Sequence, residues 1–132
     1  MLKIDYKFKD ESLLRLAMTH SSYANEHHGT HLQCNERLEF LGDSILGAIV
    51  ASTAFHRFHD LDEGGLTRIK VALVSGASLS DVADGLGFAD VIVFGSSETG
   101  TGKRGLHSAL ENVYEAVVAA LYLDGGIDVA AA

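Results

Sequence analysis

The sequence has no proline in its 132 residues, so no prolyl ring interrupts the helical patterns that run along it. Alternating runs of β-branched residues, which would indicate strands, are also few. Hydrophobic residues make up 47% of the chain, which is enough to form the core of one domain of this length. The composition therefore predicts a single, mostly helical domain over residues 1–132.

Cysteine is nearly absent, because Cys34 is the only one. No disulfide can form within the chain, which fits a reducing cytoplasm, and we expect Cys34 to be a small buried side chain. The N-terminus lacks the basic and then apolar pattern of an export signal. No apolar run reaches the length of a membrane span, so we expect a cytoplasmic protein with no membrane partner.

Positive charge is also scarce. Ten Lys and Arg residues against 18 Asp and Glu residues give a formal net charge of −8. Taken alone, this balance argues against nucleic-acid binding, which usually depends on a basic surface. The argument weakens if some of the carboxylates hold metal ions, because their charge is then cancelled during function.

Three acids stand in a stretch that is otherwise strongly apolar. Glu36, Glu39 and Asp43 have the spacing i, i+3 and i+7, which places them on one narrow face of a helix. Apolar residues cover the other faces, so we expect the helix over residues 38–50 to be largely buried. A buried carboxylate is costly unless its charge is cancelled. Two interpretations stay open here: a solvated acidic surface, or a face that holds a cation.

A second stretch, residues 106–123, has the same character. It is apolar on nearly every face, and we expect Ser108 to open it as part of a capping box. Its strongly polar side chains past the first turn are Glu111, Asn112 and Glu115. If the two helices pack side by side, their oxygen ligands would form a pocket that suits a hard divalent cation such as Mg²⁺.

Shorter helices are predicted from their caps. Asp10 is expected to cap a helix near the N-terminus, and Asp62 to cap one over residues 63–74. Ser78 or Ser80 is expected to cap a further helix.

Two other polar sites leave alternatives open. Residues 95–105 are expected to form a loop whose Lys103 and Arg104 either contact an RNA backbone or are simply solvated. His59 and Asp60 form a pair of the kind used by helical metal-dependent phosphohydrolases. A small-molecule phosphohydrolase is therefore a further hypothesis.

Residues 35–44, with the sequence NERLEFLGDS, resemble the signature of the ribonuclease III family. The similarity continues in the family's order and usual spacing through residues 19–26, 62–64, 114–116 and 122–126. The resemblance implies an all-α fold, the ribonuclease III endonuclease domain, in which a helical bundle forms a homodimer. The double-stranded-RNA-binding domain that usually follows in the family is missing from this sequence, and we expect that the chain is truncated.

The resemblance also implies an activity. It is an endoribonuclease that hydrolyses the phosphodiester bonds of double-stranded RNA by Mg²⁺-dependent attack of water, leaving 5′-phosphate and 3′-hydroxyl ends. Mn²⁺ is an expected substitute for Mg²⁺, and the implied cellular roles are rRNA and mRNA processing. The alternative is a non-catalytic ribonuclease III-like dimeric module that binds RNA or the ribosome.

Site residues follow from the same resemblance. The implied metal ligands are Glu39, Asp43, Asn112 and Glu115. Asp43 and Glu115 are the implied catalytic residues, and Glu36 and Glu63 occupy neighbouring positions at the dimer edge. The family most often has Asp where this chain has Asn112. An amide oxygen can still bind Mg²⁺, but one negative charge is lost, so we expect weaker metal binding.

Overall fold

The computed structural model describes residues 6–20, 34–88, 92, 103–127 and 130. Within this part of the chain the regular elements are α-helices, and no strand occurs. The helices are α1 (Glu11–Met18), α3 (Glu36–Arg57), α4 (Glu63–Leu73), α5 (Gly76–Gly85) and α6 (Lys103–Gly125). The predicted all-α fold class is confirmed.

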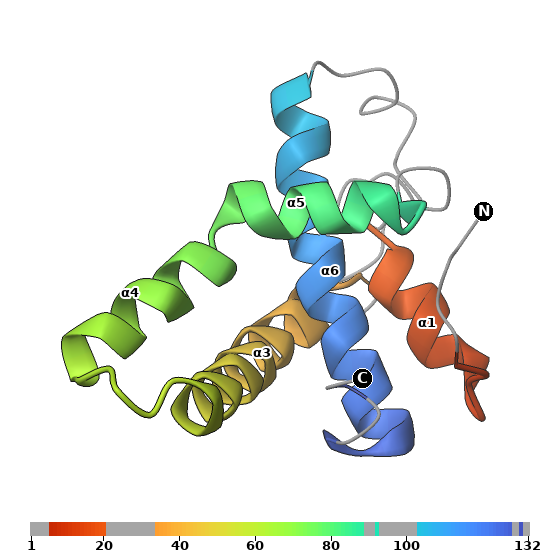
Figure 1. Cartoon of the computed structure of the whole chain (residues 1–132). Coiled ribbons are helices and arrows are strands. Elements are labelled where there is room, and N and C mark those ends of the chain that lie inside the picture. The colour runs from red at the N-terminus through yellow and green to blue at the C-terminus, as the bar shows by residue number, and fades with distance from the viewer. Residues whose placement is uncertain (1–5, 21–33, 89–91, 93–102, 128–129, 131–132) are drawn as a thin grey trace.

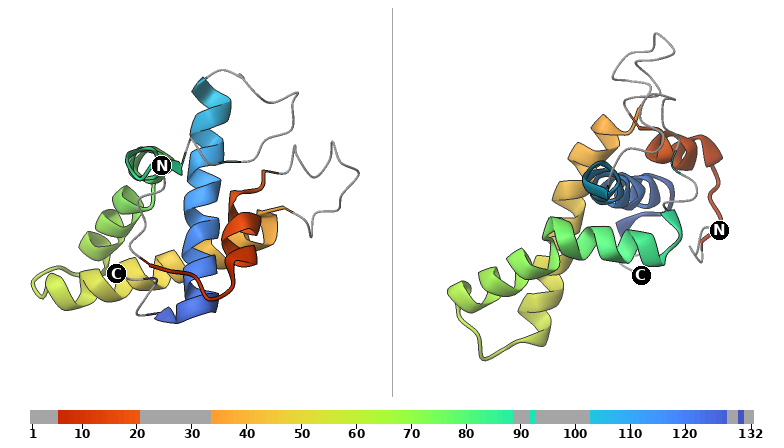
Figure 2. Two further views of the ribbon diagram at one scale, coloured as in Figure 1. Left: turned by 90° about the vertical axis from the view of Figure 1, so that its right-hand side faces the viewer. Right: turned by 90° about the horizontal axis from the view of Figure 1, so that it is seen from above.

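Helix α6 runs through the middle of the molecule, with α3 crossing it and with α1 and α5 packed on other sides (Figures 1 and 2). Its central turns are buried, as the sequence predicted. The buried residues of α6 are Ala109, Leu110, Val113, Glu115, Ala116, Val117, Val118, Ala119 and Ala120. Most of them are small, so the surrounding helices can approach the α6 backbone closely.

Side chains of several other described segments complete this core. Phe8, Met18, Leu38 and Phe88 pack around α6 in the main hydrophobic cluster. A second cluster of Leu46, Leu79 and Val118 joins α3, α5 and α6. Helix α3 is therefore fixed against α6 both near its start and near its middle.

The predicted helix caps were right for α1 and α4 and wrong for α5 and α6. The Asp10 and Asp62 carboxylates accept backbone N–H groups of the following turns at 3.0 and 2.9 Å. Helix α5 instead begins after Ser75, whose hydroxyl oxygen accepts the N–H of Ser78 at 3.3 Å. Ser78 is thus the donor to the cap, and Ser80 is buried inside the helix.

Helix α6 begins at Lys103, earlier than predicted. Ser108, the expected cap, is an exposed residue inside the helix. Lys103 and Arg104 belong to the first turn of α6 and not to the predicted loop. The loop was predicted over residues 95–105, a stretch rich in Gly, Ser and Thr, of which residues 95–102 lie outside the described residues. Gly105 belongs to α6, because one glycine inside a helix costs only about 1 kcal/mol and a long packed helix offsets that cost.

The expectation that α3 is largely buried was wrong. Its buried residues, Leu38, Gly42, Leu46 and Ala54, form one stripe, whereas the Phe40 ring is 80% exposed. Among the described helices, α6 and α4 are the ones in extensive contact with α3, and they cover mainly this stripe. Much of the apolar surface of α3 is left uncovered within the described part of the chain.

The second half of α3 and the antiparallel α4 project from the core as an arm (Figure 1). The large apolar side chains exposed on this arm are Phe55, Phe58, Leu61, Val71 and Leu73. By length and composition alone, α3 is long and apolar enough to cross a membrane, contrary to the expectation that no apolar stretch of the chain reaches that length. One such helix is weak evidence of a membrane span, because core helices of globular proteins can have the same length and composition.

Candidate active site

The acidic row of α3 and one acid of α6 line the same pocket. Glu36, Glu39 and Asp43 of α3 surround it together with Phe40 and with Glu115 of α6. The pocket has a volume of about 380 Å³. The structure therefore brings Glu39 and Asp43 of α3 together with Glu115 of α6, which follows them by more than 70 residues along the chain.

The crossing of α3 and α6 explains why these side chains meet. Gly42 is buried at the crossing, and its backbone faces the backbone carbonyl of Glu115. Asp43 directly follows this point of closest approach on α3. Glu115 itself is only 8% exposed, whereas Glu36 and Asp43 are exposed and Glu39 is half-buried. The acids thus run from the protein interior out to its surface.

Burial and the negative charge of neighbouring acids raise the pKa values of the two least exposed acids, Glu115 and Glu39. The pKa of Glu115 is raised to about 8, chiefly because burial disfavours its charged form. A hydrogen bond shared with Asp43 and the negative charges of Asp43, Glu39 and Glu111 raise this pKa further. The pKa of Glu39 is also raised, first by burial and then by Glu36, Glu111 and Asp43. The cluster is therefore an excess of negative charge that a bound cation would relieve.

Glu111 was not among the predicted site residues, although its charge acts on both Glu39 and Glu115. Its place beside Glu115 could have been predicted from the sequence, because Glu111 and Glu115 stand at i and i+4 and share a face of α6. Asn112, the predicted fourth ligand, is half-buried and does not line the 380 Å³ pocket. Its proposed role as a ligand stays a prediction.

The donor set of the pocket fits a hard divalent cation. All of its polar groups are carboxylates, and oxygen ligands are those that Mg²⁺ and Ca²⁺ prefer. Among the described residues, no three His, Cys, Asp or Glu side chains are already close enough to enclose a metal ion. The acids therefore line one pocket without three of them enclosing a single point.

None of the other predicted residues whose side chains the structure describes lines this pocket. Glu63 is exposed in the first turn of α4, at the end of the arm. The side chains of Lys103 and Arg104 lie outside the described part of the structure. His59 and Asp60 are exposed between α3 and α4 and do not line the acidic pocket. The position of this pair does not favour a phosphohydrolase site.

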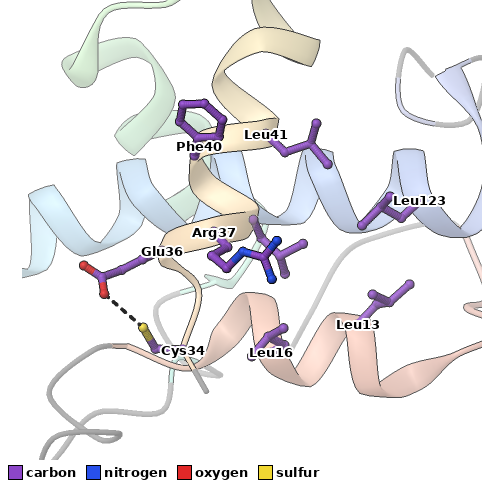
Figure 3. A pocket seen from close by; sticks show the side chains of 9 residues that line it. Leu13, Leu16, Cys34, Glu36, Arg37, Phe40, Leu41 and Leu123 are labelled. Atoms are coloured by element: carbon purple, nitrogen blue, oxygen red, sulfur yellow. Dashed lines mark hydrogen bonds between the residues drawn. The ribbon is translucent and has the colours of Figure 1, made fainter. Parts of the chain in front are cut away.

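A larger apolar pocket of about 840 Å³ adjoins the acids (Figure 3). It is lined mainly by leucines of α1, α3 and α6, together with Cys34, Glu36, Arg37 and Phe40. Cys34 is buried, as predicted, and its thiol donates to Glu36 Oε1 at 3.4 Å. Burial is the largest cause of the raised pKa of Cys34. Glu36 and Phe40 line both pockets, so the acidic and apolar surfaces are continuous.

These features define a class of protein: an all-helical domain with a carboxylate cluster where its two longest helices cross. The family model described as ribonuclease-III-like matches residues 10–132. The chain therefore belongs to the ribonuclease III family.

Individual relatives agree with this assignment. Ribonuclease 3 of Symbiobacterium thermophilum is 49% identical over 127 residues, which are 96% of this chain and 53% of that protein. Ribonuclease 3 of Solibacter usitatus is 47% identical over an alignment of 136 positions, gaps included, which covers 99% of this chain and 50% of that protein. The chain thus spans about half the length of the curated relatives that it matches.

A solved structure shows the same fold. The nuclease domain of ribonuclease III from Campylobacter jejuni superposes with a TM-score of 0.86 at 36% identity, covering 96% of this chain and 84% of that one. That domain was described as having structural flexibility in a region involved in dimer formation.

Proposed function

We propose that this chain is the catalytic domain of an endoribonuclease that hydrolyses double-stranded RNA with Mg²⁺, leaving 5′-phosphate and 3′-hydroxyl ends. Membership of the ribonuclease III family supports this proposal. The structural observation that carries it is the pocket in which Glu39, Asp43 and Glu115 meet. An acidic pocket at a helix crossing suits phosphodiester cleavage, because a divalent cation held there counters the charge of the scissile phosphate.

In the proposed site, Glu39, Asp43 and Glu115 hold the cation, and Asn112 supplies a fourth oxygen. When bound, Mg²⁺ would make an attacking water more acidic and neutralise charge on the phosphate. The raised pKa of Glu115 means that this carboxyl keeps its proton at neutral pH in the free protein. Glu115 would release that proton as the cation binds, because a nearby positive charge favours the carboxylate.

The proposal includes a homodimer. Phe40 is 80% exposed beside an apolar pocket, and the arm of α3 and α4 exposes further large apolar side chains. Exposed apolar surface of this kind marks interaction sites. In such a dimer, Glu36 and Glu63 would lie at the edge between the subunits. Their separation within one chain fits that role, because Glu63 belongs to the first turn of α4 and does not line the pocket that Glu36 lines.

RNA binding is assigned in part to Lys103 and Arg104. Both lie in the first turn of α6, where the helix dipole also favours phosphate groups. A-form RNA is recognised mostly by its shape and its 2′-hydroxyls, so we expect weak sequence preference. The roles in rRNA and mRNA processing and the cytoplasmic location stay predictions from the resemblance.

Replacement of Glu115 by alanine tests the proposal. We expect Glu115→Ala to slow Mg²⁺-dependent cleavage of long duplex RNA by at least about 100-fold, since loss of a ligand should exceed the usual effect of losing a residue that only supports one. RNA binding in a gel-shift assay should survive, because Glu115 is buried. Glu11→Ala is the matched control, since Glu11 is an exposed acid on α1 and does not line the pocket.

The same assay distinguishes the non-catalytic alternative. That alternative predicts that the chain binds duplex RNA but does not cut it with Mg²⁺ or Mn²⁺. It also predicts that Asn112→Asp, which restores the acid most common in the family, gains no activity. Cleavage by the unaltered chain or by Asn112→Asp excludes the alternative.

A further inference from the structure

We propose that Gly42 is a positioning residue of the acidic pocket: its missing side chain lets α3 and α6 approach closely enough for Asp43 and Glu115 to share one site. This inference rests on the proposed function. It assigns no contact with substrate to Gly42. The role is to set the distance between the two backbones that carry the acids.

The geometry at the crossing leaves no space for a side chain. A Cβ atom added to Gly42 would lie 1.7 Å from the carbonyl oxygen of Glu115 and 2.5 Å from its carbonyl carbon. Real Cβ contacts below 3.0 Å essentially never occur, so something must move. Both atoms belong to the backbone of α6, and no side-chain rotation can relieve the overlap. An alanine at position 42 would therefore push the two helices apart.

The place of this contact connects it to the site. On α3 the contact falls at the residue next to Asp43, and on α6 it falls at Glu115 itself. Separating the backbones here moves the two carboxylates apart directly. Mg²⁺ requires oxygen ligands at about 2.0–2.1 Å in near-octahedral geometry, so it tolerates little displacement. Misplacement of reacting groups by about 1 Å can cost about 100-fold in rate.

Gly47 provides a matched comparison on the same helix. A Cβ atom added there would meet only the flexible end of Lys70, at 3.6 Å, which is ordinary van der Waals contact. Gly42→Ala and Gly47→Ala therefore make the same chemical change in α3 and gain the same helix propensity. The two variants differ in whether the new methyl group meets the Glu115 backbone.

Gly42→Ala could lower activity either by destabilising the fold or by moving the two acids apart, and a second variant distinguishes these effects. Leu46 is buried one turn beyond Gly42 and packs with Leu79 and Val118, so Leu46→Ala weakens the same helix contact by leaving a cavity. This variant destabilises the contact without adding an atom at the crossing. It serves as the control for loss of stability alone.

The experiment measures Mn²⁺ affinity by titration calorimetry or electron paramagnetic resonance, and duplex RNA cleavage, for the 132-residue chain and the three variants. Circular dichroism and urea unfolding establish that each is folded. For Gly42→Ala we expect an Mn²⁺ affinity at least about tenfold weaker, a kcat about 100-fold lower, and an unchanged KM for RNA. Gly47→Ala and Leu46→Ala should keep affinities and rates close to those of the original chain.

Several results would contradict the positioning role of Gly42. Unchanged affinity and kcat in Gly42→Ala overturn the inference, and so does an equal loss in Leu46→Ala. If Gly42→Ala is unfolded in plain buffer, the affinity is measured in concentrated sucrose, which favours the compact state. A variant that stays unfolded there also overturns the inference, since Gly42 is then a requirement of folding alone. If the original chain neither binds Mn²⁺ nor cuts RNA, the proposed function itself fails.

Discussion

The side-chain amide of Asn35 donates a hydrogen bond to the backbone carbonyl of Ala17 at 3.1 Å. This bond is buried, and it links the last turn of α1 to the residue that precedes α3. The backbone N–H of Asn35 also donates, to the carbonyl of Thr19 at 2.9 Å. Asn35 thus fixes the start of the helix that carries Glu36 and Glu39.

Replacement of Asn35 by alanine should destabilise the fold. The Ala17 carbonyl would lose its side-chain donor in a buried place, which typically costs about 1–3 kcal/mol of unfolding free energy. Urea unfolding monitored by circular dichroism measures this loss. Asn35→Asp keeps the size of the side chain but removes the donor, and it should be at least as destabilising. A stable Asn35→Asp variant would show that the bond contributes little.

The carboxylate of Asp124, near the end of α6, holds the N-terminal segment. It accepts the hydroxyl of Tyr6 and the backbone N–H of Lys9 at 2.8 Å each, and the backbone N–H of Asp10 at 3.0 Å. These groups lower the pKa of Asp124, with the Lys9 N–H as the largest cause. We expect Asp124→Asn to lower the thermal midpoint at neutral pH.

The sign of the pH effect on Asp124 follows from the direction of its shift. A lowered pKa in the folded state stabilises the protein above the unfolded value and loses that effect as the pH falls through the folded value. The difference in midpoint between the original chain and Asp124→Asn should therefore shrink below about pH 4. Asp81→Asn, at an exposed position on α5, is the control. A difference that is independent of pH would contradict the assignment.

Glu115 should make the metal-free protein less stable as the pH rises. Its pKa is about 8 when folded, against about 4.3 when unfolded. Between these values the folded state keeps a proton that the unfolded state has lost, so unfolding free energy falls with rising pH. Glu115→Gln removes this pH dependence. Above about pH 8, its unfolding free energy should exceed that of the original chain by on the order of a few kcal/mol.

Thermal unfolding in a chelator between about pH 5 and pH 9 measures this effect. Added Mg²⁺ should raise the midpoint of the original chain more than that of Glu115→Gln, because the cation favours the charged carboxylate. Glu11→Gln, on the exposed surface of α1, should follow the original curve. Parallel curves for all three chains would show that Glu115 titrates normally.

The grouping of acids on each helix can be predicted from the sequence, because it depends only on spacing along one helix. Helical spacing places Glu36, Glu39 and Asp43 on one face, and the apolar character of residues 106–123 correctly predicts that the second helix is buried. That the two helices cross beside Glu115 was inferred only by assuming that they pack together. Gly42 belongs to the signature in residues 35–44, but the sequence does not show that its backbone meets that of Glu115.

The errors have a common physical cause. The apolar residues of α3 predict burial, but the sequence of one chain does not show whether its own helices or another molecule covers them. Phe40 is consequently exposed where burial was expected. The start of α5 was misplaced because Ser75, Ser78 and Ser80 can all act as caps, and tertiary packing selects among them. The start of α6 was placed too late, because the helix continues through Gly105 to Lys103.

Replacement of Asn112 by aspartate should strengthen metal binding if Asn112 is a ligand. The change adds one negative charge and keeps the size of the side chain, and the charge count of the ligands sets cation affinity. We expect the Mg²⁺ concentration for half-maximal cleavage to fall by about tenfold. Asn112→Ala should move it in the opposite direction. If both variants require the same Mg²⁺ concentration as the original chain, Asn112 does not contact the cation.

Phe40 tests the proposed homodimer. Its ring is 80% exposed and lines both the acidic and the apolar pocket, so a partner seated on this surface would bury it beside the site. Full burial of a phenyl ring contributes about 1.5–3 kcal/mol, and a two-fold interface buries two of them. Phe40→Ala should therefore weaken dimerisation at least about 100-fold in analytical ultracentrifugation.

An exposed apolar residue elsewhere provides the comparison. Val82 is 46% exposed on α5, so Val82→Ala removes apolar surface without touching either pocket. This variant should dimerise like the original chain. A chain that is monomeric at every concentration, or a Phe40→Ala variant that dimerises normally, would remove Phe40 from the interface. In either case the exposed ring beside the carboxylates would need another partner, and duplex RNA would be the first to test by gel shift with the same two variants.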